Sequence, residues 1–241
     1  LFELGAIDEQ QVITRQGREL ARLPLDPRLG RMLLGAMQAP LEAARVVVVA
    51  GLSIQDPRQR PVDHAALADE AHATFRDEQS DFVTLLRLWQ QAAAQRATSS
   101  RRQYENWCEG QFLSPRRMRE WRDVALLLAR QRKVDVSALS PQLVLDEAQR
   151  RALHEAVLSG LLSHVGHRDE NNTFLGAGQR RFQIHVSSAL HAKPPQWLMA
   201  LEIVQTHKRL ARYCAAVDND MILRAAGPLL DYRYERPRWQ P

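Results

Sequence analysis

The spacing of apolar residues changes near Ser163, and this change limits what the chain can fold into. Before Ser163, apolar residues recur every three or four positions, which is the spacing of a helix face. After it, short apolar or alternating runs occupy residues 174–177, 182–186, 198–205 and 210–217. Strands this short and this close together favour a small antiparallel barrel. We therefore expect a mainly helical α+β chain that ends in a small β-barrel, a helix near Met221–Leu230 and a loosely ordered tail.

Capping residues mark where the predicted helices begin. Ser, Thr and Asp side chains accept a hydrogen bond from a free helix amide, and Pro fits the first helical position. Such signals occur at Thr14, Asp26-Pro27, Ser80, Ser114-Pro115 and Ser140-Pro141. With the apolar spacing they predict helices over residues 15–23, 27–37, 64–75, 101–110 and 147–162, and helices that begin after Ser80, Ser114 and Ser140. Gly5 is expected to end a first, short helix.

Residues 41–52 form the densest apolar stretch of the chain. The run Val46–Val49 has the β-branched composition of a strand. Its flanks are rich in alanine, however, and no polar residue alternates with the valines. This stretch is therefore predicted to be a buried helix.

Three arginines follow directly on the helix start at Ser114-Pro115: Arg116, Arg117 and Arg119. Cations at this end of a helix oppose its dipole, so their placement does not favour stability. Free amides and guanidinium groups together can hold a phosphate, which suggests an anionic partner. The alternative is a solvated surface turn whose arginines pair with nearby acids such as Glu120 and Asp123.

Basic residues gather in two segments of the sequence. Residues 101–133 hold nine Lys or Arg against four acids, and residues 174–214 hold six against one. Residues 61–89 have the opposite balance, with six acids and two arginines. Two basic segments in a folded chain are the footprint that a polyanion requires, although basic patches also serve solubility alone.

Signatures of catalysis are absent from the sequence. It has no glycine-rich phosphate loop and no local nucleophile motif. Cys108 and Cys214 lack metal-ligand spacing, and we interpret them as reduced thiols of a cytoplasmic protein. The acids Asp77, Glu78 and Asp81 are read as acids at a helix start, not as a catalytic pair. No apolar run is long enough to cross a bilayer, and the opening residues, which lack Met, suggest a piece of a longer protein.

Nine motifs occur in an order and spacing that resemble the C-terminal half of the DEAH-box RNA helicases, most closely the bacterial HrpA type. They lie at Leu4–Asp8, Ile13-Thr14 with Gly17-Arg18, Leu23–Arg28, Leu52–Arg58, Glu78–Phe82, Phe112–Trp121, Leu158–Leu162, Phe182–His185 and Trp197–Lys208. The resemblance implies the C-terminal part of a winged helix in residues 1–40 and a helical ratchet domain in 41–145. It also implies an OB-fold barrel with a C-terminal helix and tail in 146–241.

The same resemblance implies a function. Members of the family couple ATP hydrolysis to 3′-to-5′ movement along single-stranded RNA, and ATP and Mg²⁺ bind in RecA-like domains that this sequence does not contain. The chain is therefore expected to be inactive alone and to form one wall of the RNA channel. Its expected partners are single-stranded RNA and the RecA-like domains, with an activator protein or the ribosome as further candidates and no membrane. A protein-interaction scaffold is the alternative function.

Two places carry the RNA contacts that the resemblance implies. Ser114 and Arg116 match family positions at the start of the ratchet helix, and Thr206 and Lys208 match positions at the end of an OB strand. The remaining predicted RNA-binding residues come from the two basic segments: Arg117, Arg119, Arg180 and Arg181. Phe174, Phe182 and Trp197 are candidates for base stacking, with packing in the barrel core as the alternative.

Overall fold

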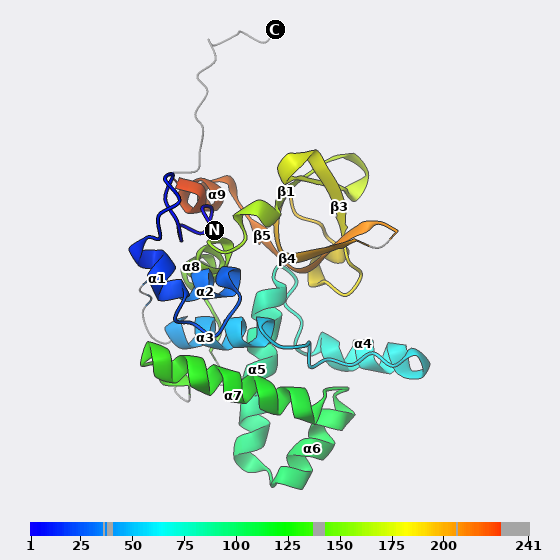
Figure 1. The fold of residues 1–241 in the computed structure, drawn as a ribbon. Helices are drawn as coiled ribbons and strands as arrows, with labels where there is room; N and C mark the ends of the chain where they lie inside the picture. The colour runs from blue at the N-terminus through cyan, green and yellow to red at the C-terminus, as the bar shows by residue number, and fades with distance from the viewer. Residues whose placement is uncertain (36, 38–40, 137–142, 206, 228–241) are drawn as a thin grey trace.

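The structure is a computed structural model, and it describes residues 1–35, 37, 41–136, 143–205 and 207–227. Its helices are α1 (Arg15–Leu20), α2 (Pro27–Leu33), α3 (Leu41–Leu52), α4 (Ala65–Ala73), α5 (Asp81–Thr98), α6 (Arg101–Gly110), α7 (Pro115–Arg132), α8 (Glu147–Leu158) and α9 (Asn219–Ala226). Its strands are β1 (Val165–Arg168), β2 (Phe174–Gly176), β3 (Arg180–Ile184), β4 (Trp197–Gln205) and β5 (Arg209–Val217). The expected class, mainly helical α+β with a terminal barrel, is confirmed (Figure 1).

The predicted capping residues begin their helices as expected. The side chains of Thr14, Asp26, Ser80 and Ser114 each accept a hydrogen bond from an amide in the first turn. The predicted start at Ser140-Pro141 lies outside the described residues, as does the tail. The prediction of a helix before Gly5 was wrong. Residues 1–5 form turns, because the amides of Leu4 and Gly5 donate to the carbonyls of Leu1 and Phe2, only three positions back.

Four helices end earlier than predicted, at Leu20, Leu33, Ala73 and Leu158. The last of these ends where α8 meets α2. A Cβ at Gly160 would lie 2.3 Å from the carbonyl oxygen of Arg28, so only glycine allows this approach. The tertiary contact, which apolar spacing does not show, therefore turns the chain out of the helix.

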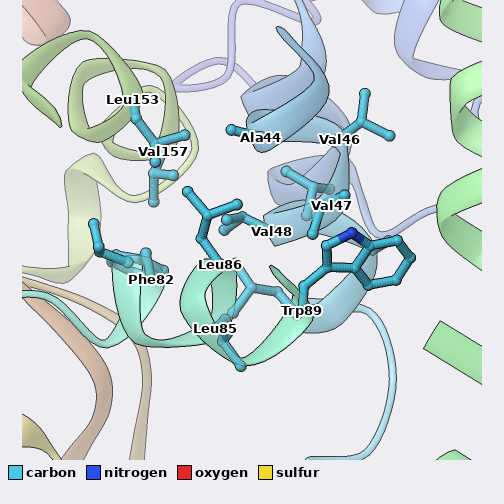
Figure 2. Packing of buried hydrophobic residues seen from close by; sticks show 14 of the residues in the cluster. Ala44, Val46, Val47, Val48, Phe82, Leu85, Leu86, Trp89, Leu153 and Val157 are labelled. Atoms are coloured by element: carbon cyan, nitrogen blue, oxygen red, sulfur yellow. The ribbon is translucent and has the colours of Figure 1, made fainter. Parts of the chain in front are cut away.

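Helix α3 is the centre of the helical part, and every one of its residues is buried. Figure 2 shows its Val47 and Val48 on the side that faces Leu86 and Trp89 of α5. The predicted buried helix is confirmed. On its other side the indole nitrogen of Trp121 in α7 donates to the carbonyl of Val47 at 2.8 Å. The valines form a helix here because neighbouring helices cover all sides of it, which outweighs their strand propensity.

The five strands close into a barrel in the order β1-β2-β3-β5-β4, with β3 and β5 parallel and the other pairs antiparallel. All four runs named from the sequence are strands. Strand β1, which was not among them, has the residues Val-Gly-His-Arg and too little apolar pattern to detect. Phe174 and Phe182 are buried and stack at 5.7 Å, so they belong to the barrel core and are not platforms for bases.

The first turn of α5 fastens the barrel to the helices. Asp81 is buried, and its two carboxylate oxygens accept the amides of Ala189 at 2.9 Å and Cys214 at 2.8 Å. The buried Asp77 binds Arg150 of α8 through two hydrogen bonds, at 2.7 and 2.9 Å. These aspartates stand near a helix start, as predicted. Their partners, however, lie in elements that are remote in the sequence, and the acids stabilise the junction between the two parts.

The buried His154 of α8 makes the stability of this junction sensitive to pH. Its Nε2 lies 2.8 Å from the hydroxyl of Ser80. Burial, with a smaller effect from Arg150, lowers the pKa of His154 to about 4. An unfolded histidine titrates near pH 6.5, so the unfolded chain takes up this proton first as the pH falls. The stability that the neutral ring contributes is complete above pH 6.5 and is lost towards pH 4.

We expect the free energy of unfolding to fall by about 2 kcal/mol between pH 7 and pH 5 because of His154. Urea unfolding at both pH values measures it, with His154→Gln as the comparison. The variant should lose about 2 kcal/mol less than the wild type over this interval. Equal losses in both proteins would show that His154 does not titrate as its burial requires.

Candidate nucleic-acid interface

A groove of about 650 Å³ lies between the segment that contains α4 and the barrel. We call it the interdomain groove. One wall is the segment 56–60 with α4 and Arg76, and the other is residues 185–189 with Arg212 of β5. Figure 1 shows α4 extending beside the barrel on the same side as the β4–β5 hairpin. Four arginines and three aspartates line the groove, so its electrostatic character depends on which of them are paired.

Two of these arginines are neutralised by neighbouring aspartates. Arg58 binds Asp56 through its Nε at 3.1 Å and a terminal nitrogen at 2.8 Å. Arg60 binds Asp69 in the same two-point manner, at 2.7 and 2.8 Å. The aspartates therefore compensate most of the positive charge of Arg58 and Arg60.

Arg76 and Arg212 are the other two arginines of the groove, and they lie on its opposite walls. Arg76 is exposed and donates to the carbonyl of Ser188 at 3.2 Å, a contact that does not compensate its charge. Arg212 forms an ion pair with Glu202 at 3.4 Å across the β4–β5 pair, which compensates part of its charge, and its side chain is about two-fifths exposed. Two guanidinium groups that face one groove form a reasonable site for a phosphate backbone.

The pair Asp56–Arg58 holds the groove wall to strand β5. Burial alone would raise the pKa of the Asp56 carboxyl, but the charge and hydrogen bonds of Arg58 hold it below its usual value. The guanidinium of Arg58 also lies 6.0 Å from the ring centre of Tyr213. Tyr213 has a positive φ of 52°, an uncommon conformation for a residue with a side chain. Arg58 is therefore a structural residue of the groove.

The start of α7 lies directly behind this wall. The amide of Ser114 donates to Pro57 and the amide of Gln59 donates to Phe112, both at 2.8 Å. Arg117 reaches back to the carbonyl of Asp56 at 2.9 Å. Ser114 is half-buried as the helix cap, and Arg116 is exposed, with no ion pair or hydrogen bond of its guanidinium within the described part of the chain. Of the three arginines, Arg116 is thus placed to meet an external anion near the groove.

Arg119 is separated from the other two arginines and turns towards α6, where it binds Glu105 at 3.1 Å. The acids that the sequence offered as partners, Glu120 and Asp123, pair with none of the three within the described residues, and Asp123 instead binds Arg122. The three arginines therefore do not form one cluster. Arg116 faces solvent, Arg117 binds the groove wall, and Arg119 joins α7 to α6. Sequence spacing missed this because the partners come from other elements.

The predicted cations of the barrel lie at the starts of two parallel strands. Arg180 and Arg181 are the first residues of β3, and Lys208 directly precedes β5. All three are exposed, and Arg181 pairs with Asp169 at 2.8 Å. Arg212 lies four residues along β5 from Lys208, about 13 Å at the usual rise of a strand. Thr206 lies outside the described residues.

The groove arginines were not singled out from the sequence. Arg76 lies in the acidic segment 61–89, and Arg58 and Arg60 lie between two predicted helices and outside both basic segments, so the sequence composition did not indicate them. Arg212 belongs to the second basic segment, which was the one usable signal. Trp197, the third stacking candidate, is half-buried. Its ring and that of His167 form an edge-to-face contact with ring centres 4.6 Å apart.

Other kinds of site find no support in the described ranges. No group of three or more His, Cys, Asp or Glu there could hold a metal ion. Burial raises the pKa of both Cys108 and Cys214, which keeps these buried thiols protonated and unreactive. No described helix combines the length and the apolar character that a membrane crossing needs.

Three family models match successive parts of the chain. They are the winged-helix part of the helicase associated domain HA2 over residues 1–25, its ratchet-like part over 26–85, and an oligonucleotide/oligosaccharide-binding fold over 153–229. The ATP-dependent RNA helicase HrpA homolog of Haemophilus influenzae is 38% identical over 99% of this chain. HrpA of Escherichia coli is 37% identical over 100% of it, and the pre-mRNA-splicing helicase prp22 of Schizosaccharomyces pombe is 25% identical over 94%. The chain spans 19% of the length of each.

Proposed function

Because this chain is similar over its whole length to the C-terminal region of HrpA-type ATP-dependent RNA helicases, we propose that it binds single-stranded RNA and forms one wall of an RNA channel. The observation that carries the proposal is the interdomain groove, with Arg76 and Arg212 on its opposite walls. The proposed path continues to Arg116 on one side and to Lys208 and Arg181 at the barrel end on the other. The proposed RNA path would run between the ratchet unit, residues 41–145, and the OB unit, residues 146–241.

The proposed binding is mainly electrostatic. The aromatic rings of Phe174 and Phe182 are buried in the barrel and cannot stack on bases. Phosphate contacts carry little sequence information, so the chain should bind different single strands with similar affinity. One wall alone neutralises few phosphates, and we expect micromolar or weaker binding.

ATP hydrolysis is assigned to other parts of the longer protein. The sequence has no loop that cradles phosphates, and the described residues include no cluster that could hold Mg²⁺. The proposed contribution of this chain is to bind and orient the RNA strand while the ATPase domains act.

The proposal is tested by fluorescence anisotropy with a labelled 12-nucleotide polyuridine RNA at several salt concentrations. Arg116→Ala should weaken binding about fivefold, because one charge-assisted contact at a wet surface is lost. Its thermal stability should stay the same or rise slightly, since the charge opposes the helix dipole. Arg130→Ala, an exposed arginine farther along α7, is the matched control and should bind as the wild type does.

Three outcomes would contradict this reading. Tight binding that does not change with salt would indicate apolar or base-specific recognition, and would count against a phosphate path. Equal effects of Arg116→Ala and Arg130→Ala would show that only the total charge matters. Lowered stability of Arg116→Ala with unchanged affinity would make Arg116 a structural residue.

A further inference from the structure

A second, more strongly charged pocket lies between α5, α6 and α7. We call it the arginine pocket. It has a volume of about 470 Å³ and is lined by the end of α5, one face of α6 and the first turns of α7. Figure 1 shows α6 on the side of α7 that faces away from the barrel. The residues that line the pocket are distinct from those that line the interdomain groove.

The arginine pocket carries an excess of positive charge. Its lining includes the four arginines Arg96, Arg101, Arg119 and Arg122. Glu105 is the one carboxylate among the residues that line it. Arg122 also binds Asp123, which stands outside the lining. Four guanidinium groups around one carboxylate leave the pocket able to bind further anions.

Glu105 shows which anion this arrangement fits. Its Oε1 accepts from Arg101 at 3.0 Å and from Arg119 at 3.1 Å, so it joins α6 to α7. Both guanidinium groups stay well exposed, at 80% and 50% of their side-chain area. The two arginines are thus already spaced to hold a carboxylate and keep donors that face solvent. An external carboxylate would meet the same geometry.

The remaining lining favours a peptide over a nucleic acid. The ring of Tyr104 stacks on Trp107 at 6.0 Å, which covers one ring face. The apolar residues among the lining are Pro115 and the largely buried Met118. Phosphate groups of RNA would use the arginines alone, whereas a peptide can place acidic side chains on the arginines and an apolar side chain beside Pro115 and Met118.

We propose that the arginine pocket binds an acidic peptide segment of a protein partner, with acidic side chains on Arg96, Arg101, Arg119 and Arg122 and an apolar side chain over Met118. Glu105 competes with the peptide for Arg101 and Arg119. Removing its charge frees two guanidinium groups, so affinity for the peptide rises. This rise separates a built carboxylate site from a surface that attracts anions only by its total charge.

The probe is a fluorescein-labelled peptide Glu-Glu-Leu-Asp-Glu-Leu-Glu-Glu, measured by anisotropy against the whole chain. Glu105→Gln should tighten binding about threefold, and Arg101→Ala should weaken it about fivefold. Each variant has a control on the same helix that changes the charge equally: Glu109→Gln and Arg102→Ala, both exposed and outside the pocket lining. The controls should bind the peptide as the wild type does.

The same variants are titrated with the 12-nucleotide polyuridine RNA. Unchanged RNA affinity in Glu105→Gln and Arg101→Ala supports the peptide assignment, and it also leaves the proposed RNA path to be judged on its own residues. If these two substitutions change RNA binding and not peptide binding, the pocket is a nucleic-acid site and the proposal is overturned. Equal effects of Glu105→Gln and Glu109→Gln on the peptide overturn it as well.

Discussion

Replacing Asp81 with alanine should lower the free energy of unfolding by about 4 kcal/mol, because two buried amides then lose a charged acceptor. In the folded chain the carboxylate of Asp81 accepts from Ala189 and Cys214, and the residue is 4% exposed. Each buried donor left without a partner costs about 1–3 kcal/mol, and the lost charged hydrogen bonds add to this. Urea unfolding at pH 7 measures the change.

Two further variants make the Asp81 experiment specific. Asp81→Asn keeps one acceptor oxygen but turns an amide donor towards the other backbone N–H, so it should recover only part of the lost stability. Glu78→Ala, an exposed acid in the preceding turn, should change stability by less than about 0.5 kcal/mol. A loss below about 1 kcal/mol in Asp81→Ala would mean that the barrel is held to the helices by other contacts.

Removing three cations along the proposed RNA path, as Arg76→Ala, Arg116→Ala and Lys208→Ala together, should weaken binding of polyuridine RNA about 100-fold. The three residues are exposed and belong to different segments, so their separate costs of about 1 kcal/mol should add. Binding to a single strand falls with salt in proportion to the phosphates contacted. The slope of log affinity against log salt should therefore decrease in magnitude by about 2 units.

The matched control removes three exposed arginines that lie away from the path: Arg22, Arg102 and Arg130. It lowers the net charge by the same amount, so it measures what total charge alone contributes. The control should lose less than about fivefold in affinity and keep its slope. If both triple variants lose affinity equally, the bound strand does not follow the groove, and the proposed channel wall is wrong.

The local structure of the helical part could be predicted well from the sequence. A cap such as Thr14 or Ser114 acts on amides two or three positions away, so the helix start is encoded in one short stretch. The ends of the helices were less predictable. At Gly160 the chain leaves α8 because of the backbone of Arg28, which no local pattern reveals.

The candidate site was predictable only in part. The basic segments pointed to the right regions, and Arg116 is exposed as a contact with an external anion requires. Arg117 and Arg119 were grouped with it, yet each binds a group in another segment. Arg76 was missed because it lies among acids in the sequence, although the fold places it against the barrel. The charge of a segment does not show which of its charges are paired.

The sequence by itself determined the change from helices to a barrel, the helix starts and the family, because each of these depends on residue types at short and fixed spacings. Only the tertiary structure decided which charged side chains face solvent. Asp81, Arg58 and Arg117 look like surface residues in the sequence, but partners more than fifty positions away bury or bind them. Ion pairs and buried hydrogen bonds depend on the distance between remote segments, and that distance exists only once the helices and the barrel have packed together.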